Sequence, residues 1–300
     1  MQLLRMRRHK NLVPAVLSET VSEKNKNLKI ELEKTQMKTN LIIIGAICVV
    51  MASVSFGDTV VVSPSNMDSW AFYTTDDSGI IGTGTGTGEM VTGPATPPLG
   101  TGSAHLMTAA NYGDGSVQLR NSSWAGTRID ALTTLSYSTY ATAWNGQQLP
   151  YLTIWLDTDG DGARDDRLWF EPTYSEADAG NGNPFPQQDL ALNTWQTWDA
   201  LNGMWYSDNI AGPGSNAITL AAYLAQKPNA TIINDAYQSI GGIRVASGFA
   251  SPEDNFNANV DNFSIGTAAG TTTYNFEVVP EPATIGLLGL GALSLIRRKK

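Results

Sequence analysis

Cysteine is almost absent from this chain of 300 residues, which contains a single example, Cys48. Cys48 lies inside an apolar run, residues 41–54, and follows Ile47, where a lipoprotein signal has a small residue. We therefore expect no lipid anchor at this position. The rest of the chain has no cysteine, which excludes disulfides, cysteine nucleophiles and thiolate metal sites there.

Lysine and arginine are scarce between the two ends of the chain. Residues 58–282 contain six of them against 24 Asp and Glu, a formal charge of about −18, whereas the whole chain carries −9. The six cations are Arg120, Arg128, Arg164, Arg167, Lys227 and Arg244. Such a surface repels a phosphate backbone, which argues against nucleic acid as a partner and favours divalent cations or neutral polymers.

Histidine is also rare, and His105 is the only one in residues 58–282. It has no Ser and Asp partners in a recognisable triad pattern, so we expect a structural role. Abundant carboxylates leave glycoside hydrolysis open, but a loop-like segment separates Glu171 from Glu176. The sequence predicts no catalytic site, with a polysaccharide-degrading enzyme as the less favoured alternative.

The last apolar run, residues 283–296, is uncharged and short. A helix of this length spans ~21 Å at about 1.5 Å per residue, less than the ~30 Å hydrocarbon layer. The run follows Pro280, Glu281 and Pro282 and precedes Arg297, Arg298, Lys299 and Lys300. These cations place the C-terminus in the cytoplasm by the positive-inside rule. We expect a short transmembrane helix that anchors the protein transiently; a core helix is the alternative, disfavoured by the terminal cations and by three internal glycines.

The sequence "VPEPAT", the short apolar stretch and the basic end together resemble the PEP-CTERM sorting signal of Gram-negative and related bacteria, also called an ice-binding protein C-terminal domain. The resemblance covers residues 277–300. It implies that an exosortase, a transpeptidase-like membrane enzyme, cuts near Pro280, Glu281 and Pro282. It also implies delivery to the cell surface or an extracellular polymer matrix.

A sorting tail requires an export signal, and residues 37–57 provide one. Met37 and Lys38 precede the apolar residues 41–54, and small residues flank Phe56. This pattern predicts a signal helix that signal peptidase cuts after Gly57. We interpret the polar residues 1–36 as a gene-model extension or a disordered segment, with a long signal n-region as the alternative.

Residues 58–276 alternate short apolar segments with Gly, Asn, Asp and Pro, a pattern typical of strands separated by turns. Strands are expected at residues 59–62, 105–108, 116–120, 131–137, 151–156, 167–170, 195–198, 240–245, 260–265 and 273–276. One helix is expected between its N-cap, Thr219, and Pro228. The fold class predicted is all-β, a two-sheet jelly-roll sandwich with one short helix.

Segments within residues 132–266, among them "TWQTWDAL" and "GGIRVASG", resemble a domain of bacterial secreted proteins without an assigned activity. The segment "NVDNFSIG" resembles the closing strand of concanavalin/laminin-G-like and carbohydrate-binding sandwiches. The resemblance implies a β-sandwich and export. We interpret the Gly-, Thr- and Pro-rich residues 79–102 as an insertion or mobile loop, with a binding loop as the alternative.

Five carboxylates lie in the segment "LDTDGDGARDD": Asp157, Asp159, Asp161, Asp165 and Asp166. The first three alternate before Gly162, as in the first half of an EF-hand loop, where oxygen ligands surround Ca²⁺. Leu168 stands where that loop has a bidentate Glu, so one of the last two carboxylates has to supply the missing charge. A polar hairpin turn is the alternative. Mutual repulsion in an empty turn favours Ca²⁺ as a cofactor.

All eight tryptophans lie in residues 58–276. Exposed aromatic faces stack on sugar rings, although core packing is the usual role of Trp in a sandwich. We expect Trp155 and Trp169 in the core. The candidate ligand-binding group, close together in sequence, is Trp195, Trp198, Trp205 and Tyr206.

These observations predict an exported surface or matrix protein that binds glycan or another extracellular polymer. Its expected processing partners are signal peptidase and an exosortase. The alternative is a purely structural or adhesive matrix protein without a small ligand.

Overall fold

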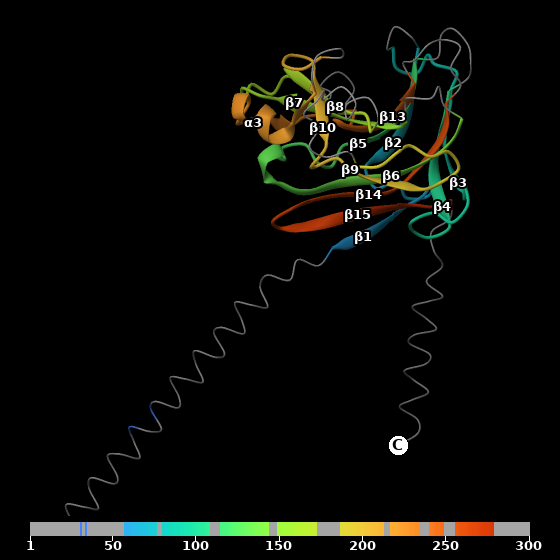
Figure 1. Ribbon diagram of the computed structural model, residues 1–300, viewed down its shortest axis with the longest axis horizontal. Helices are drawn as coiled ribbons and strands as arrows, with labels where there is room; N and C mark the ends of the chain where they lie inside the picture. The colour runs from blue at the N-terminus through green and yellow to red at the C-terminus, as the bar shows by residue number, and fades with distance from the viewer. Residues whose placement is uncertain are drawn as a thin grey trace, which may run out of the picture. The chain divides into compact units, whose positions relative to one another are not determined.

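Alternating apolar and polar residues form two β-sheets that pack face to face in the computed structural model (Figure 1). The structure describes residues 31, 34, 57–76, 80–108, 115–143, 149–172, 187–212, 217–234, 240–248 and 256–278. The chain from Phe56 to Lys300 forms one compact unit and Met1–Ser55 another. The two expected terminal membrane helices lie outside the described residues, within which no helix is long and apolar enough to cross a membrane.

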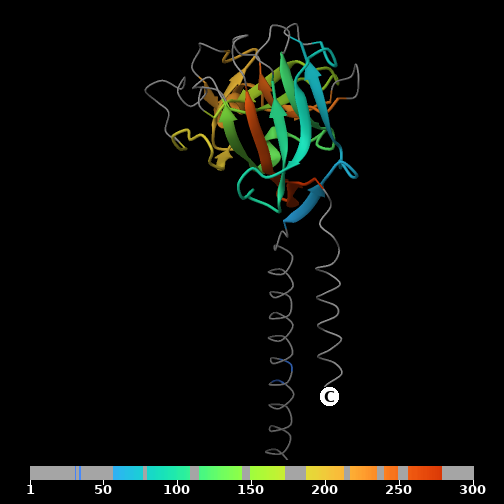
Figure 2. The ribbon, with the colours of Figure 1, turned by 90° about the vertical axis from the view of Figure 1, so that its right-hand side faces the viewer.

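The first sheet has seven strands and is organised around β14 (Asn257–Thr267). Its other strands are β1 (Asp58–Val62), β3 (Thr87–Thr92), β4 (Gly102–Met107), β6 (Leu132–Ala143), β9 (Gln196–Asp199) and β15 (Gly270–Phe276). β14 pairs with β6 on one side and with β4 and β15 on the other, as Figure 2 shows for orange β14 between green β6 and teal β4. β1 pairs in parallel with β15, so the first and last strands are neighbours.

The second sheet has eight strands, all of them antiparallel. In order they are β11 (Ile218–Thr219), β10 (Met204–Ser207), β8 (Asp166–Phe170), β7 (Tyr151–Asp157), β13 (Ile243–Gly248), β5 (Ser116–Asn121) and β2 (Trp70–Thr75), while β12 (Thr231–Ile232) pairs with β7. β7 pairs with both β8 and β13. Side chains of these two strands therefore lie on either side of the side chains of β7.

The main core lies between the two sheets and is rich in large aromatic side chains. Trp70 of β2 makes edge-to-face contacts with Phe263, Tyr274 and Phe276 of the other sheet, at centroid distances of 5.1, 5.2 and 5.3 Å. The buried Trp205 donates its indole N–H to the carbonyl of Ala200 at 2.8 Å. The ring contacts of Trp70 join the two sheets by burying apolar area between them.

The helix expected after Thr219 is present as α3 (Leu220–Gln226), and a 3₁₀ turn, η1 (Ile129–Ala131), precedes β6. The Thr219 hydroxyl accepts a hydrogen bond from the amide of Ala222 at 3.2 Å, which satisfies one of the free donors of the first turn. Tyr223 of α3 donates to Asp166 of β8 at 3.0 Å, which attaches the helix to the eight-stranded sheet.

The predicted all-β, two-sheet sandwich with one short helix is confirmed for the described residues, while the jelly-roll topology stays a prediction. Residues 79–102 are only in part a loop, because β3 lies within them and pairs with β4 at the sheet edge. The sequence did not predict this strand because glycine is uncommon in strands. β2 and β10 were also missed, because both are short segments in which aromatic residues follow one another without clear alternation.

Two buried carboxylates hold residues 99–101 to the last two strands. Asp261 of β14 accepts hydrogen bonds from the amides of Leu99 and Phe276, at 2.9 and 3.1 Å. Glu277 accepts from the amide and hydroxyl of Thr101. Burial raises the pKa of the Asp261 carboxyl to about 7, against the lowering effect of its backbone hydrogen bonds.

This pKa predicts that the domain loses stability as the pH rises. A carboxyl with a pKa of about 7 in the folded state and ~3.9 in the unfolded state binds more protons when folded. Its contribution is therefore complete below about pH 4 and is lost as the pH rises through about 7, by up to roughly 4 kcal/mol at ~1.4 kcal/mol per pKa unit. Urea unfolding at several pH values measures this slope.

Asp261→Asn should flatten the slope, and Asn in place of the exposed Asp68 serves as the control. An unchanged slope in the Asp261 variant would contradict the assignment.

Candidate functional site

The eight-stranded sheet is buried on both faces, and only one of them belongs to the main core. Along β7, the side chains of Leu152, Ile154 and Leu156 enter the core between the sheets. The alternate side chains, Tyr151 and Trp155 among them, stand on the opposite face, here called the outer face. Buried polar and aromatic residues on this face have no role in joining the two sheets.

Arginines gather on the outer face, although they are scarce elsewhere in the domain. Four of the six cations of residues 58–282 stack on aromatic rings there. The pairs and their distances to the ring centroid are Arg120–Trp155 at 4.4 Å, Arg164–Trp155 at 4.9 Å, Arg167–Trp169 at 4.6 Å and Arg244–Tyr151 at 5.5 Å. Since about one such pair per 70–80 residues is ordinary, this concentration on one face is unusual.

Hydrogen bonds along and between the strands position two of these arginines. Arg244 of β13 lies opposite Thr153 of β7 and donates its Nε–H to the threonine hydroxyl at 2.7 Å. Arg120 of β5 donates its Nε–H to Gln118 on the same strand, also at 2.7 Å. Both guanidinium groups are buried, and burial lowers the pKa of Arg244, an effect that the nearby Arg167 and Arg164 increase.

A pocket of about 290 Å³ opens on the outer face. Its lining residues come from the three adjacent strands β8, β7 and β13 and from the residue that follows β8. They are Tyr151, Thr153, Arg167, Trp169, Glu171, Arg244 and Gly248. Arg167 pairs with Asp208 at 2.9 Å through Nη2, while its buried Nε has no hydrogen-bond partner within the described ranges. The lining of the pocket therefore combines two aromatic side chains with two guanidinium groups.

Glu171 is the carboxylate of this pocket. Burial raises the pKa of its side chain to about 7, and the positive charge of Arg167 opposes that rise. Burial raises the pKa values of Tyr137 and Tyr151, and the charge of Glu171 adds to both rises. Near neutral pH this carboxyl has both protonation states available.

The structure does not bring the four sequence-predicted ligand residues to one surface. Trp198 and Trp205 are 0% exposed and belong to the main core. Trp195 is half-buried next to Tyr140 of the seven-stranded sheet and donates to the carbonyl of Pro94 at 3.0 Å. Tyr206 stands on the outer face of β10, and its ring is 5.4 Å from that of Trp169. Adjacent residues of a strand face opposite ways, which separates Tyr206 from Trp205.

Trp155 and Trp169 are buried, as the sequence predicts, but they lie on the outer face and outside the main core. The sequence did not predict the pocket that lies beside Trp169, which Arg244, Tyr151 and Glu171 line. The available signal was the alternation of residues 151–156, since Tyr151, Thr153 and Trp155 share one side of a strand. The scarcity of arginine was a second signal.

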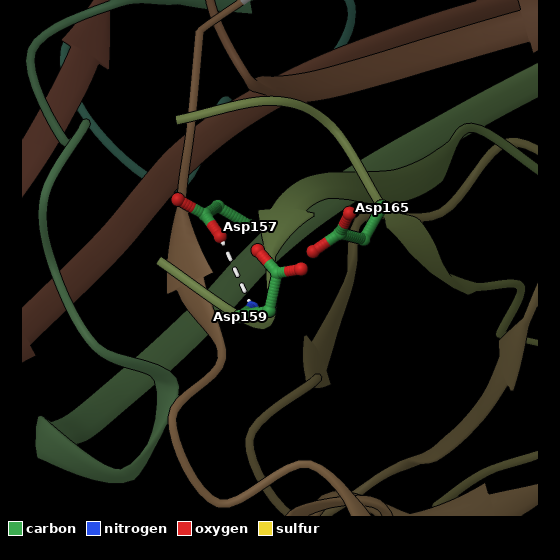
Figure 3. A group of neighbouring side chains, drawn as sticks. All are labelled: Asp157, Asp159 and Asp165. Atoms are coloured by element: carbon green, nitrogen blue, oxygen red, sulfur yellow. Dashed lines mark hydrogen bonds between the residues drawn. The ribbon is translucent and has the colours of Figure 1, made fainter. Parts of the chain in front are cut away.

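Three of the five predicted metal-ligating carboxylates converge in the turn between β7 and β8. Asp157, Asp159 and Asp165 each offer one oxygen within 4.8 Å of the others, as Figure 3 shows. The turn is also a well-bonded hairpin, because Asp157 accepts from the amides of Asp159, Gly160 and Gly162 at 3.2, 2.7 and 2.9 Å. Hydrogen bonds from Thr158 lower the pKa of Asp165, which keeps it ionised.

Asp161 and Asp166 are not part of this group. Asp161 accepts a hydrogen bond from the amide of Ala163 at 2.7 Å, within the turn. Asp166 is the first residue of β8 and is 1% exposed, with Ser207 and Tyr223 donating to its carboxylate at 2.7 and 3.0 Å. It points toward α3 because it shares the side of β8 that Leu168 and Phe170 use for the core.

His105 has a partner that accounts for its position. Its Nε2 lies 2.9 Å from Oδ1 of Asn257, the residue near it on the paired strand β14. This contact joins two strands of the seven-stranded sheet, on the opposite side of the sandwich from the pocket.

A comparison with protein families matches residues 278–300 to the PEP-CTERM protein-sorting motif, in agreement with the tail predicted at residues 277–300. Apart from residue 278, the matched residues lie outside the described ranges. No curated protein matched the chain. The chain carries a PEP-CTERM sorting motif, which indicates export, processing by an exosortase, and a cell-surface or extracellular destination.

Proposed function

We propose that this exported protein binds an extracellular glycan in the pocket on the outer face of its eight-stranded sheet. The observation that carries the proposal is the lining of that pocket, in which Tyr151 and Trp169 stand beside Arg244 and Glu171. A sugar ring presents apolar C–H faces and a rim of hydroxyls, so it suits a site with aromatic walls and a few polar groups.

The pocket volume limits the part of a polymer that enters. About 290 Å³ corresponds to roughly ten water molecules at ~30 Å³ each, which is space for a single sugar unit. Of the described residues that line it, Glu171 alone has a carboxylate, whereas most glycoside hydrolases use a pair. These features favour binding over hydrolysis. A purely structural matrix protein remains the second candidate function.

A glycan array tests the proposal, using the compact unit Phe56–Lys300 in a detergent without a sugar headgroup. Trp169→Ala should weaken binding of any retained glycan at least tenfold, about 1.4 kcal/mol, because it removes one wall of the pocket. Trp169→Phe should keep most of the affinity. Trp124→Ala, at the half-buried indole that donates to Tyr274, is the matched control with unchanged affinity.

Thermal unfolding of each variant separates lost binding from lost folding. Trp205→Ala should instead cost ~3–5 kcal/mol of stability, since it empties a core position. Binding that depends on Trp195 and not on Trp169 would place the glycan on the other sheet and refute the proposal. A silent array would favour the structural candidate.

We also propose Ca²⁺ as a structural cofactor in the turn between β7 and β8. The convergence of Asp157, Asp159 and Asp165 supports it, because Ca²⁺ takes 6–8 oxygen ligands and carboxylates are its strongest protein ligands. The ion would offset the repulsion between the three charges. It would act on stability, by holding the ends of β7 and β8 together.

Calorimetric titration with Ca²⁺ should give saturable heat, and EDTA should lower the melting temperature of the metal-loaded protein. Asp159→Asn removes one of the three converging charges and should abolish the Ca²⁺-dependent shift. Asp161→Asn, in the same turn but outside the group, should preserve it. If Ca²⁺ gives no binding heat and EDTA does not change the melting temperature, the Ca²⁺ proposal is wrong and the turn is a polar hairpin.

The sorting motif also supports a transient membrane anchor. We propose that the apolar residues 283–296 hold the protein in the membrane, with Arg297 to Lys300 inside, until an exosortase cuts near Glu281. Glu281→Ala should leave the uncut, heavier chain in the membrane fraction, as an immunoblot of cell fractions would show. Glu89→Ala, at an exposed glutamate outside the matched residues, is the control. Normal release of the Glu281 variant would contradict this role.

A further inference from the structure

We infer that the pocket on the outer face recognises the carboxylate of an acidic sugar unit, a uronic acid of an extracellular polysaccharide. This inference rests on the proposed function, because it specifies which class of glycan the same pocket takes. It differs from what net charge suggests, since a domain with about −18 should prefer neutral polymers.

The first step is the local charge of the outer face. Among the described residues that line the pocket, Arg167 and Arg244 are cations and Glu171 is a carboxylate, while Asp208 pairs with Arg167. Burial is the main cause that lowers the pKa of Arg244, and the positive charges of Arg167 and Arg164 lower it further. Such mutual repulsion costs stability, and an anionic ligand would offset it.

The second step is the lack of an internal anion for Arg244. This side chain is 5% exposed, and within the described part of the chain no carboxylate lies close enough to form an ion pair with it. Its contacts are the Thr153 hydroxyl and the Tyr151 ring. Buried charges in proteins are normally paired, so a buried guanidinium that lines an open pocket has capacity for an external partner.

The third step is the placement of the donors. Arg244 on β13 and Arg167 on β8 lie on the two strands that flank β7, so their side chains reach the pocket from opposite sides. The Nε–H of Arg167 is buried without a partner among the described residues. A guanidinium is a planar fork of donors that matches a carboxylate through two parallel hydrogen bonds, a geometry that a single hydroxyl cannot use.

The fourth step distinguishes a sugar acid from a simple anion. Tyr151 and Trp169 line the pocket beside the arginines that stack on them, and a pyranose ring, unlike an inorganic ion, has C–H groups that contact such apolar surface. A uronic acid carries its carboxylate on that ring, so one unit uses both features of the pocket.

Glu171 does not prevent this recognition. Burial raises the pKa of Glu171 to about 7, so near neutral pH a bound carboxylate meets a large fraction of the protonated form, which donates a hydrogen bond. Among the described residues, Arg167, Tyr137 and Tyr151 interact electrostatically with Glu171, and Arg167 and Arg244 are the cations that line the same pocket.

Calorimetric titration tests the inference with matched oligosaccharides that differ only in the ligand charge. Oligogalacturonate, oligoglucuronate and oligomannuronate are each compared with their methyl esters, together with neutral oligosaccharides, on Phe56–Lys300 with EDTA present. EDTA removes any Ca²⁺ that the carboxylates of the β7–β8 turn would share with the ligand. At least one free acid should bind ten times or more tightly than its ester, and added salt should weaken this binding.

Three variants assign that preference to the pocket. Arg167→Gln, at a partly exposed residue, should reduce the preference of acid over ester at least fivefold, and Arg244→Gln should do the same if its melting temperature shows a folded domain. Arg128→Gln removes an equal charge from an exposed ion pair and should leave the preference unchanged. Glu171→Gln should tighten acid binding at pH 8, whereas a site for neutral hydroxyls would be weakened by the same change.

The outcomes separate this inference from the function on which it rests. Equal binding of acid and ester, with dependence on Trp169, would refute the acidic-sugar inference and keep the glycan site. Acid binding that Arg128→Gln reduces as much as Arg167→Gln would reflect general charge and also refute it. Failure of every oligosaccharide, charged and neutral, to bind would refute both proposals.

Discussion

The organisation of this domain depends on β7 being covered on both faces. On one side Leu152, Ile154 and Leu156 pack into the core between the sheets, which provides the hydrophobic contribution to folding. A strand that is secured in this way does not need the side chains of its other face for the core between the sheets. Tyr151, Thr153 and Trp155 occupy that face, and the neighbouring strands add arginines to them. The pocket is therefore a product of strand alternation in a central strand.

Most of the few cations in residues 58–282 stack on aromatic rings. The formal charge of residues 58–282, about −18, repels polyanions at a distance. Against that background, four arginines on one face form the principal positive region within the described residues. Each stacks on an aromatic ring, which restricts its side chain without neutralising it. Arg244 stacks on Tyr151 and forms no ion pair within the described residues, and the Nε–H of Arg167 has no hydrogen-bond partner there, although its Nη2 pairs with Asp208.

The sequence was sufficient for the fold class, for the helix after Thr219 and for the sorting motif, because each has a local pattern. It was insufficient for the candidate site, because that site depends on register between distant segments. Arg244 meets Thr153 across 91 positions of the sequence, a pairing that no local pattern contains. Proximity in sequence also led to a wrong grouping of candidate ligand residues. Trp205 and Tyr206 are neighbours in sequence, but they face opposite sides of β10. For Asp165 and Asp166 the same alternation divides two adjacent carboxylates between the turn and the contact with α3.

The acidic turn and the arginine face are parts of one hairpin. Arg164 belongs to the turn and lies 4.9 Å above the Trp155 ring, which Arg120 approaches at 4.4 Å. Asp165 accepts hydrogen bonds from the amide and hydroxyl of Thr158 at 2.7 and 3.0 Å, while Asp166 anchors the start of β8 to Tyr223. Any change that orders this turn therefore also fixes the position of Arg164 and of the start of the strand that carries Arg167 and Trp169. The turn and the pocket are therefore linked through β8, which begins at the end of the turn and carries two of the residues that line the pocket.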